Sequence, residues 1–428
     1  MCFLIYKTLK MKRIGTALVV AYVLAGCLAT KEKKSILKTG SWRATIEIQG
    51  QLLPFNFEVE KDQSEGYDIY LRNAEERILL DEVTIKGDTI DIVLHVFDSN
   101  IRARLVGDTL TGEFIKNYEA DYRIPFHAVH GQGYRFEKNK VPGNVPDFSG
   151  KYEVSFIHES DTTPSIGIFH QTGDSVTGTF LTPTGDYRYL QGNVSDGMMQ
   201  LSTFDGNHAY LFRAKKEPDG TLNGEYYSGK TWSEFWVAKK NENAVLPDAE
   251  KLTYLKEGFD RIAFSFPDVT GKKVSLTDDK YKNKVVILQL FGTWCPNCMD
   301  ETKFLAPWYI ENNKRGVEVI GLAYERKDDF TYASERVKKM ANKFNVTYDF
   351  VIAGTDKKDK AAETLAMLNT VVAFPTTIFI GKDGKVKKIH TGFSGPGTGP
   401  YYDQFIEHFN ETVNELLNEE LTSFNNLN

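Results

Sequence analysis

The feature that most constrains the fold is a pair of cysteines placed where a buried strand gives way to a helix. The run Val285 to Leu290 is strongly apolar, and Trp294-Cys295-Pro296-Asn297-Cys298 follows it at the start of a helix-compatible stretch. Free backbone N–H groups and the positive end of the helix dipole stabilise a thiolate at such a position. Cys295 is therefore the candidate nucleophile, and one helical turn brings Cys298 within bonding distance of it.

The alternatives for this pair are a metal site and a structural disulfide. A zinc site needs two more ligands, usually a second close pair. The chain has only four cysteines, and the other two, Cys2 and Cys27, lie in a leader. The two histidines that lie closest to each other, His127 and His130, are far from the cysteines in the sequence and belong to a strand-rich region. Because a CxxC after a strand is the redox signature, the sequence predicts thiol–disulfide exchange with no metal and no cofactor.

The segment from Phe291 to Cys298 resembles the active site of TlpA/ResA-type thioredoxin-fold proteins, which are thiol–disulfide reductases of the cell envelope. The resemblance covers Phe259 to about Leu417. It implies that Phe374-Pro375 is the cis-proline loop of the fold, although most X-Pro bonds are trans. The residues expected to face a substrate are Trp294, Pro296, Phe374 and Pro375.

The same resemblance implies a proton acceptor for Cys298. Plain thioredoxins bury an aspartate six residues before the first cysteine, where this chain has Gln289, which cannot accept a proton. Glu301 lies one helical turn after Cys298 and matches the glutamate that is the acid–base group of the family. Its neighbour Asp300 is expected to be a solvated residue of the helix surface. The proline that bends this helix in relatives is replaced by Pro307, one turn later.

The order of elements after residue 246 is that of a thioredoxin-like α/β domain, expected over 246–428. A hairpin formed by 262–266 and 273–276 should come first. Strands are expected at 285–290, 317–323, 348–353 and 378–380, and helices from the cysteines to 314 and at 332–344, 357–367 and 402–417. Alternating strands and helices predict a mainly parallel sheet covered on both faces. The extra helix and strand before the proline loop correspond to the central insertion of the TlpA/ResA family.

The amino terminus carries an export signal. Basic residues from Met11 to Arg13 precede the apolar run Ile14 to Ala25, which is too short to cross a bilayer. Leu24-Ala25-Gly26-Cys27 resembles the lipobox of bacterial lipoproteins, which implies that Cys27 carries a lipid anchor; a plain signal with an incidental cysteine is the alternative. We expect a signal peptide over 1–26, starting at Met1 or Met11, and a tether over 27–37. The chain would then face the periplasm from either membrane.

Residues 38–243 are a different kind of sequence, in which apolar and polar residues alternate over short runs separated by Gly-Asp or Asp-Gly turns. This pattern predicts antiparallel sheet. An internal duplication pairs Gly40-Ser41-Trp42 with Gly150-Lys151-Tyr152, and Leu110–Phe114 with Leu222–Tyr226. The fold class expected is therefore multidomain: two tandem antiparallel β domains, 38–140 and 146–243, each a barrel or a sandwich, followed by the α/β domain.

These features predict an envelope thiol–disulfide oxidoreductase, acting as a reductase, whose cysteines exchange disulfides with exported proteins. A membrane electron donor would restore the dithiol. The net charge of −6, from 52 basic and 58 acidic residues, provides no basic field for nucleic acid. The rival is a binding lipoprotein whose β repeats hold a ligand or partner while the thioredoxin-like domain is auxiliary. A peroxiredoxin is a third option, but Gly292 stands where its signature threonine is expected.

Overall fold

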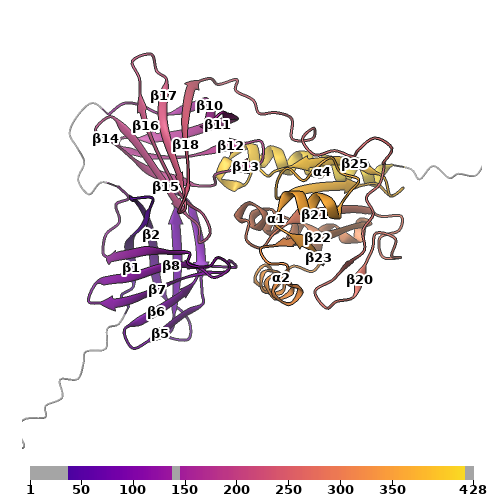
Figure 1. Cartoon of the computed structure of the whole chain (residues 1–428), viewed down its shortest axis with the longest axis horizontal. Coiled ribbons are helices and arrows are strands. Elements are labelled where there is room, and N and C mark those ends of the chain that lie inside the picture. Colours follow the sequence, from indigo (N-terminus) through magenta and orange to yellow (C-terminus); the bar gives the residue numbers. More distant parts are fainter. Residues whose placement is uncertain (1–36, 137–144, 420–428) are drawn as a thin grey trace, which may run out of the picture. The chain divides into compact units, whose positions relative to one another are not determined.

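Two antiparallel sheets of nine strands precede an α/β part that runs from β19 to α4 (Figure 1). The computed structural model describes residues 37–136 and 145–419. The predicted signal peptide, Cys27 and almost all of the tether lie outside these residues. The boundaries 38–140, 146–243 and 246–428 stay predictions, since residues 37–428 cluster as a single compact unit.

The first sheet is formed by β1 to β9 and is antiparallel throughout, in the order β4-β3-β2-β1-β9-β8-β7-β6-β5. Its strands are β1 (Gly40–Ile48), β2 (Gln51–Lys61), β3 (Tyr67–Asn73), β4 (Glu76–Leu80), β5 (Val83–Lys86), β6 (Thr89–Val93), β7 (Ser99–Val106), β8 (Thr109–Lys116) and β9 (Arg123–His130). Alternate residues of β1, from Trp42 to Ile48, are fully buried. The apolar residues that alternate in the sequence are thus those that face the inside of a barrel-like sheet.

The second sheet is formed by β10 to β18. Its strands are β10 (Gly150–His158), β11 (Asp161–Thr172), β12 (Ser175–Thr182), β13 (Gly185–Asp186), β14 (Leu190–Ser195), β15 (Met198–Phe204), β16 (Ala209–Lys216), β17 (Leu222–Ser228) and β18 (Trp232–Lys240). The order is β11-β10-β18-β17-β16-β15-β14-β12-β13, and β11 also pairs with β12. That extra pairing closes eight strands into a barrel, which leaves only the two-residue β13 at an edge.

The duplicated motifs occupy equivalent places in the two sheets. Gly40 and Gly150 open the first strand of their sheets with φ angles of 102° and 126°, a region that favours glycine. The second pair of motifs lies in β8 and β17, each the eighth strand of its sheet. The internal repeat in the sequence therefore corresponds to a repeated fold.

The α/β part contains a five-stranded sheet in the order β23-β22-β21-β24-β25. Its elements are β19 (Phe266–Pro267), β20 (Lys273–Val274), β21 (Val285–Phe291), α1 (Pro296–Asn312), β22 (Val317–Glu325), α2 (Phe330–Phe344), β23 (Asp349–Thr355), α3 (Lys358–Thr364), β24 (Thr376–Ile380), β25 (Val386–Thr391) and α4 (Pro400–Asn418). Two short 3-10 helices, Asn313–Arg315 and Pro396–Thr398, precede β22 and α4. Helix α2, strand β23 and helix α3 lie between β22 and the proline loop, and they include the extra helix and strand that were predicted there.

Two expectations for this part need correction. The sheet is half parallel rather than mainly parallel, because the chain enters β24 at the end where β21 finishes and then runs antiparallel to it. The first hairpin strand is reduced to β19. Ile262 and Phe264 alternate because they are buried in the core of the α/β part, not because they pair in a sheet.

The redox motif lies at the centre of this architecture. Strand β21 is buried at every residue and is flanked by β22 and β24, and helix α1 begins five residues after it ends. The sheet thus fixes the position at which the cysteines begin the helix. Among residues 37–136 and 145–419, no helix is both long enough and apolar enough to cross a membrane.

Candidate active site

The two cysteines form a disulfide at the start of α1. Cys295 is the N-cap residue, with an extended backbone, and its Sγ accepts a hydrogen bond from the Cys298 N–H at 3.2 Å. The Cys295 residue is 6% exposed, whereas Cys298 is completely buried. The helix start therefore supports a thiolate on the sulfur that is less deeply buried.

The proline loop lies against this disulfide, and the predicted cis peptide bond at Phe374–Pro375 is confirmed. The Sγ of Cys295 is 3.5 Å from the carbonyl oxygen of Phe374, and the ring of Trp294 meets that of Phe374 edge-on at 5.9 Å. Pro296 is the first residue of α1 and is buried. The structure thus brings all four predicted substrate-facing residues around Cys295, and their role stays a prediction.

Glu301 is completely buried between α1 and the five-stranded sheet. Thr377 of β24 donates its hydroxyl hydrogen to Oε1 at 2.6 Å, and Gln289 of β21 donates from Nε2 to Oε2 at 2.8 Å. Burial raises the pKa of Glu301 to about 7, although both hydrogen bonds act in the opposite direction. A carboxyl group with this pKa can gain or lose a proton at neutral pH, as an acid–base group must.

Asp300 is not the solvated residue that the helix pattern suggested. It is buried, it forms an ion pair with the guanidinium of Arg188, and Lys303 approaches its other oxygen at 3.1 Å. Arg188 lies between β13 and β14, so the second sheet covers this face of α1. The expectation was wrong because a helix sequence contains no signal for a face that a distant segment covers.

A further acid, Glu325, escaped the sequence analysis. Its carboxylate accepts hydrogen bonds from the backbone N–H and the hydroxyl of Thr293, both at 2.8 Å, and burial raises its pKa to about 7. The guanidinium of the next residue, Arg326, lies 4.0 Å from the ring centre of Trp294. The available signal was positional: Glu325 ends the apolar strand β22, and adjacent parallel strands finish at the same edge of a sheet.

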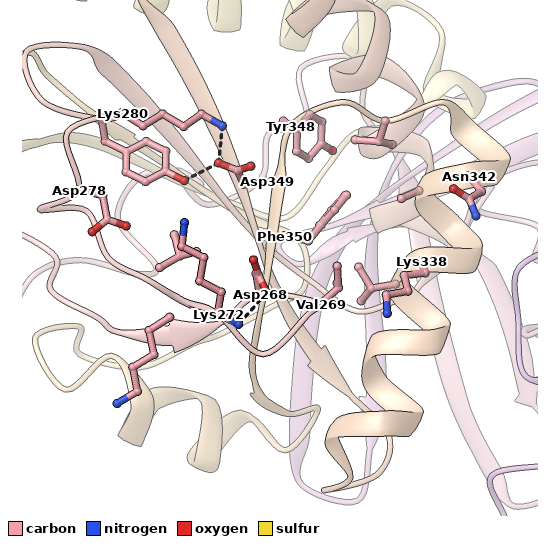
Figure 2. Close-up of a pocket in the computed structure, with 16 residues that line it drawn as sticks. Asp268, Val269, Lys272, Asp278, Lys280, Lys338, Asn342, Tyr348, Asp349 and Phe350 are labelled. Atoms are coloured by element: carbon pink, nitrogen blue, oxygen red, sulfur yellow. Dashed lines mark hydrogen bonds and ion pairs between the residues drawn. The ribbon is translucent and has the colours of Figure 1, made fainter.

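A pocket of about 610 Å³ lies near the hydrogen bonds around Glu301, and neither cysteine lines it. Figure 2 shows its lining, in which Lys280 reaches Asp349, and Tyr348 and Phe350 lie along one wall. The hydroxyl of Tyr348 donates to Oε1 of Gln289 at 3.4 Å, so this pocket adjoins the residue that holds Glu301. Within the described parts of the chain, no three metal-ligating side chains are grouped as they would be around a metal ion.

Comparison with known proteins identifies the α/β part. The AhpC/TSA family matches residues 260–389. Thiol-disulfide oxidoreductase ResA of Geobacillus thermodenitrificans (strain NG80-2) is 34% identical over 129 residues, which are 30% of this chain and 66% of that protein. ResA of Bacillus subtilis (strain 168) is 30% identical over 150 residues, which are 35% of this chain and 74% of that protein.

Among solved structures, a thiol:disulfide interchange protein of the thioredoxin family from Chlorobium tepidum TLS is 20% identical, with a TM-score of 0.29; the match covers 38% of this chain and 98% of that one. The chain thus spans just under two thirds of the Geobacillus relative, and the ResA matches cover about a third of the chain itself. Through its α/β part, the chain belongs to the ResA-type thiol–disulfide oxidoreductases of thioredoxin fold.

Proposed function

We propose that this protein is a thiol–disulfide oxidoreductase that reduces disulfides in exported proteins at the bacterial cell envelope. The observation that carries the proposal is the Cys295–Cys298 disulfide at the start of α1, beside a cis-proline loop. A buried carboxyl group with a pKa of about 7 lies one turn farther along the same helix. Nucleophile, resolving thiol and proton acceptor are then supplied by one short segment.

The reaction begins when the Cys295 thiolate attacks one sulfur of a substrate disulfide. That S–S bond breaks, a mixed disulfide forms with Cys295, and the other substrate sulfur leaves as a thiolate that takes a proton from water. Cys298 then loses its proton to the carboxylate of Glu301 and attacks the Sγ of Cys295. The second substrate sulfur leaves as a thiolate that takes a proton from water, Glu301 later releases the Cys298 proton to solvent, and the protein holds the Cys295–Cys298 disulfide.

Reduction is the proposed direction because Pro296 and Asn297, between the cysteines, carry no charge that would stabilise the reduced thiolate and make the pair a strong oxidant. A membrane electron donor would return two electrons to the disulfide. Attachment through a lipid on Cys27, facing the periplasm, would hold the α/β part near that donor. Stable attachment requires more than one lipid chain, since a single chain binds only marginally.

The direct test is to trap the mixed disulfide. In full-length Cys298→Ser the resolving thiol is missing, so the protein should accumulate adducts with disulfide-bearing proteins that appear on non-reducing gels and vanish on reduction. Cys295→Ser is the matched control and should form far fewer adducts, because Cys298 is completely buried. Equal trapping by both variants would contradict the assignment of Cys295 as nucleophile.

The anchor needs a separate test. Cys27→Ala should move the protein from the membrane fraction to the soluble fraction, while the purified variant should still reduce insulin disulfides at the wild-type rate. A variant that still sediments with membranes would rule out lipidation of Cys27. That outcome would leave the redox assignment intact, because the trapping experiment does not depend on location.

A further inference from the structure

The second sheet binds the residues that flank and separate the cysteines. The carbonyl oxygen of Pro296 accepts a hydrogen bond from Nη1 of Arg188 at 3.1 Å. Asn297 donates from Nδ2 to the carbonyl oxygen of Asp186 at 3.1 Å, and the carbonyl oxygen of Trp294 accepts from Nδ2 of Asn207 at 2.8 Å. Three residues of the redox motif are therefore held by groups more than eighty positions earlier in the chain.

The second sheet and the α/β part approach each other so closely that two glycines at the contact leave no room for a side chain. A Cβ at Gly185 would lie 2.7 Å from Nδ2 of Asn297, and one at Gly392 would lie 2.9 Å from the carbonyl carbon of Thr184. Both glycines also have positive φ angles, of 143° and 83°. The turn between β12 and β14 is thus fitted to the start of α1 and to the segment after β25.

Arg188 is the charged centre of this contact, and the residue is only 4% exposed. Its guanidinium forms ion pairs with Asp300 of α1 and with Glu76 of β4, and Nε lies 3.6 Å from Asp205. One buried cation therefore meets acids from both sheets and from the redox helix. Without it, three buried carboxyl groups would lie together near the first turns of α1 with no guanidinium between them.

Charged or titratable groups reach the start of α1 from both sides of the helix. From the two sheets these are Glu76, Asp186, Arg188, Asp205 and His208. From the α/β part they are Asp300, Glu301, Lys303, Glu325 and Arg326. Arg188 is distinctive among the cations because it contacts both the backbone of Pro296 and the carboxylate of Asp300.

We propose that Arg188 is a positioning residue for the redox reaction: it holds Pro296 and neutralises Asp300, and so keeps the Cys295 sulfur in its thiolate form. The helix start favours a thiolate only while negative charge nearby is compensated. The second sheet thereby becomes part of the redox site, since the reactivity of Cys295 depends on a side chain that this sheet supplies.

The test is the rate at which iodoacetamide alkylates Cys295 in the reduced full-length protein, measured from pH 4 to 9. Only the thiolate reacts, so the midpoint of the profile reports its formation. Arg188→Met should move the midpoint upward by about one pH unit, which is about tenfold slower alkylation below the midpoint. Arg188→Gln removes the charge but keeps an N–H donor for Pro296, and it should shift the midpoint in the same direction. It provides the measurement if Arg188→Met does not fold.

Two further variants separate charge compensation from simple docking. Arg188→Lys should have a midpoint close to that of the wild type. Adding Asp300→Asn to Arg188→Met should reverse most of the upward shift of the midpoint. Lys339→Met is the matched control, because it removes the 2.5 Å ion pair between α2 and Glu82 without touching the redox helix. An unchanged midpoint in Arg188→Met and Arg188→Gln would overturn the proposal. A shift in Arg188→Met that Asp300→Asn does not reverse would also overturn it.

Discussion

The two sides of helix α1 place neighbouring acids in opposite surroundings. On the side of the five-stranded sheet, Glu301 is bound by the neutral groups of Thr377 and Gln289. On the side of the second sheet, Asp300 is bound by the cations Arg188 and Lys303. Both acids are buried, so burial alone does not distinguish them.

The difference indicates how two neighbouring carboxyl groups can differ in protonation. Neutral donors offset only part of the desolvation of Glu301, so its pKa rises to about 7 and it can exchange a proton. A guanidinium offers the ionised carboxylate of Asp300 a full opposite charge. We therefore expect proton transfer on the side of the five-stranded sheet and fixed charge on the side of the second sheet.

The largest effect should come from removing the cation. Arg188→Met leaves the carboxylates of Glu76, Asp205 and Asp300 buried without it, so urea denaturation should show a loss of about 3 to 5 kcal/mol. Arg104→Met is the matched control, since its ion pair with Asp88 is exposed and should contribute less than about 1 kcal/mol. A loss no greater than that of the control would mean that the charged side of α1 is not a buried network.

The next effect is a gain of stability at high pH. The pKa of Glu301 is about 7 in the folded protein against 4.5 as its ordinary value, so its protonated form favours folding below pH 4.5 and this contribution is lost as the pH rises through 7. Glu301→Gln should therefore be more stable than the wild type at pH 8 by about 3 kcal/mol, and this advantage should vanish at pH 4. Urea denaturation at both pH values checks it; an equal advantage at both would exclude a proton-linked cause.

The same substitution should impair catalysis. Without the Glu301 carboxylate, hydroxide must deprotonate Cys298, so insulin reduction at pH 7 should slow on the order of a hundredfold and the pH optimum should move upward. Glu311→Gln makes the same change on an exposed position of α1 and should leave the profile in place. An unchanged pH profile in Glu301→Gln would mean that Glu301 is not the proton acceptor of Cys298.

The smallest effect should come from one hydrogen bond. Thr377→Val removes the donor to Oε1 of Glu301, which destabilises the carboxylate and should raise the pH at which insulin reduction is half-maximal by up to about one unit. Thr376→Val is the matched control, because that hydroxyl donates instead to the carbonyl oxygen of Ala373 at 2.8 Å. Equal shifts in the two variants would indicate a general packing effect.

The side of α1 that faces the five-stranded sheet could be predicted from the sequence. The CxxC after an apolar run is a local pattern, and the resemblance to the TlpA/ResA family implied the cis-proline loop and the role of Glu301. Glu301 and Thr377 are brought together by adjacent elements of one familiar fold. The alternation that predicted the two β sheets is equally local, because it reflects which side of each strand is buried.

The other side of α1 could not be read in this way. Arg188 and Asp300 are separated by 112 positions, and nothing near either residue indicates that they meet. The helix pattern makes Asp300 look solvated because the covering turn belongs to another sheet. The carboxyl group of Glu325 was missed for a different reason: its position at the end of β22 mattered, and in the sequence it is the first of a run of charged residues, Glu325 to Asp329, that looks like an ordinary solvated loop.

The most direct test of the account is the titration of Glu301 itself. The carboxyl ¹³C resonances of glutamate-labelled, disulfide-bonded protein can be followed from pH 4 to 9, and the signal of Glu301 is assigned by its loss in Glu301→Gln. We expect a titration midpoint near 7 for this signal. A midpoint below about 5, close to that of an ordinary glutamate, would contradict the claim that this side of α1 is built to hold and release a proton.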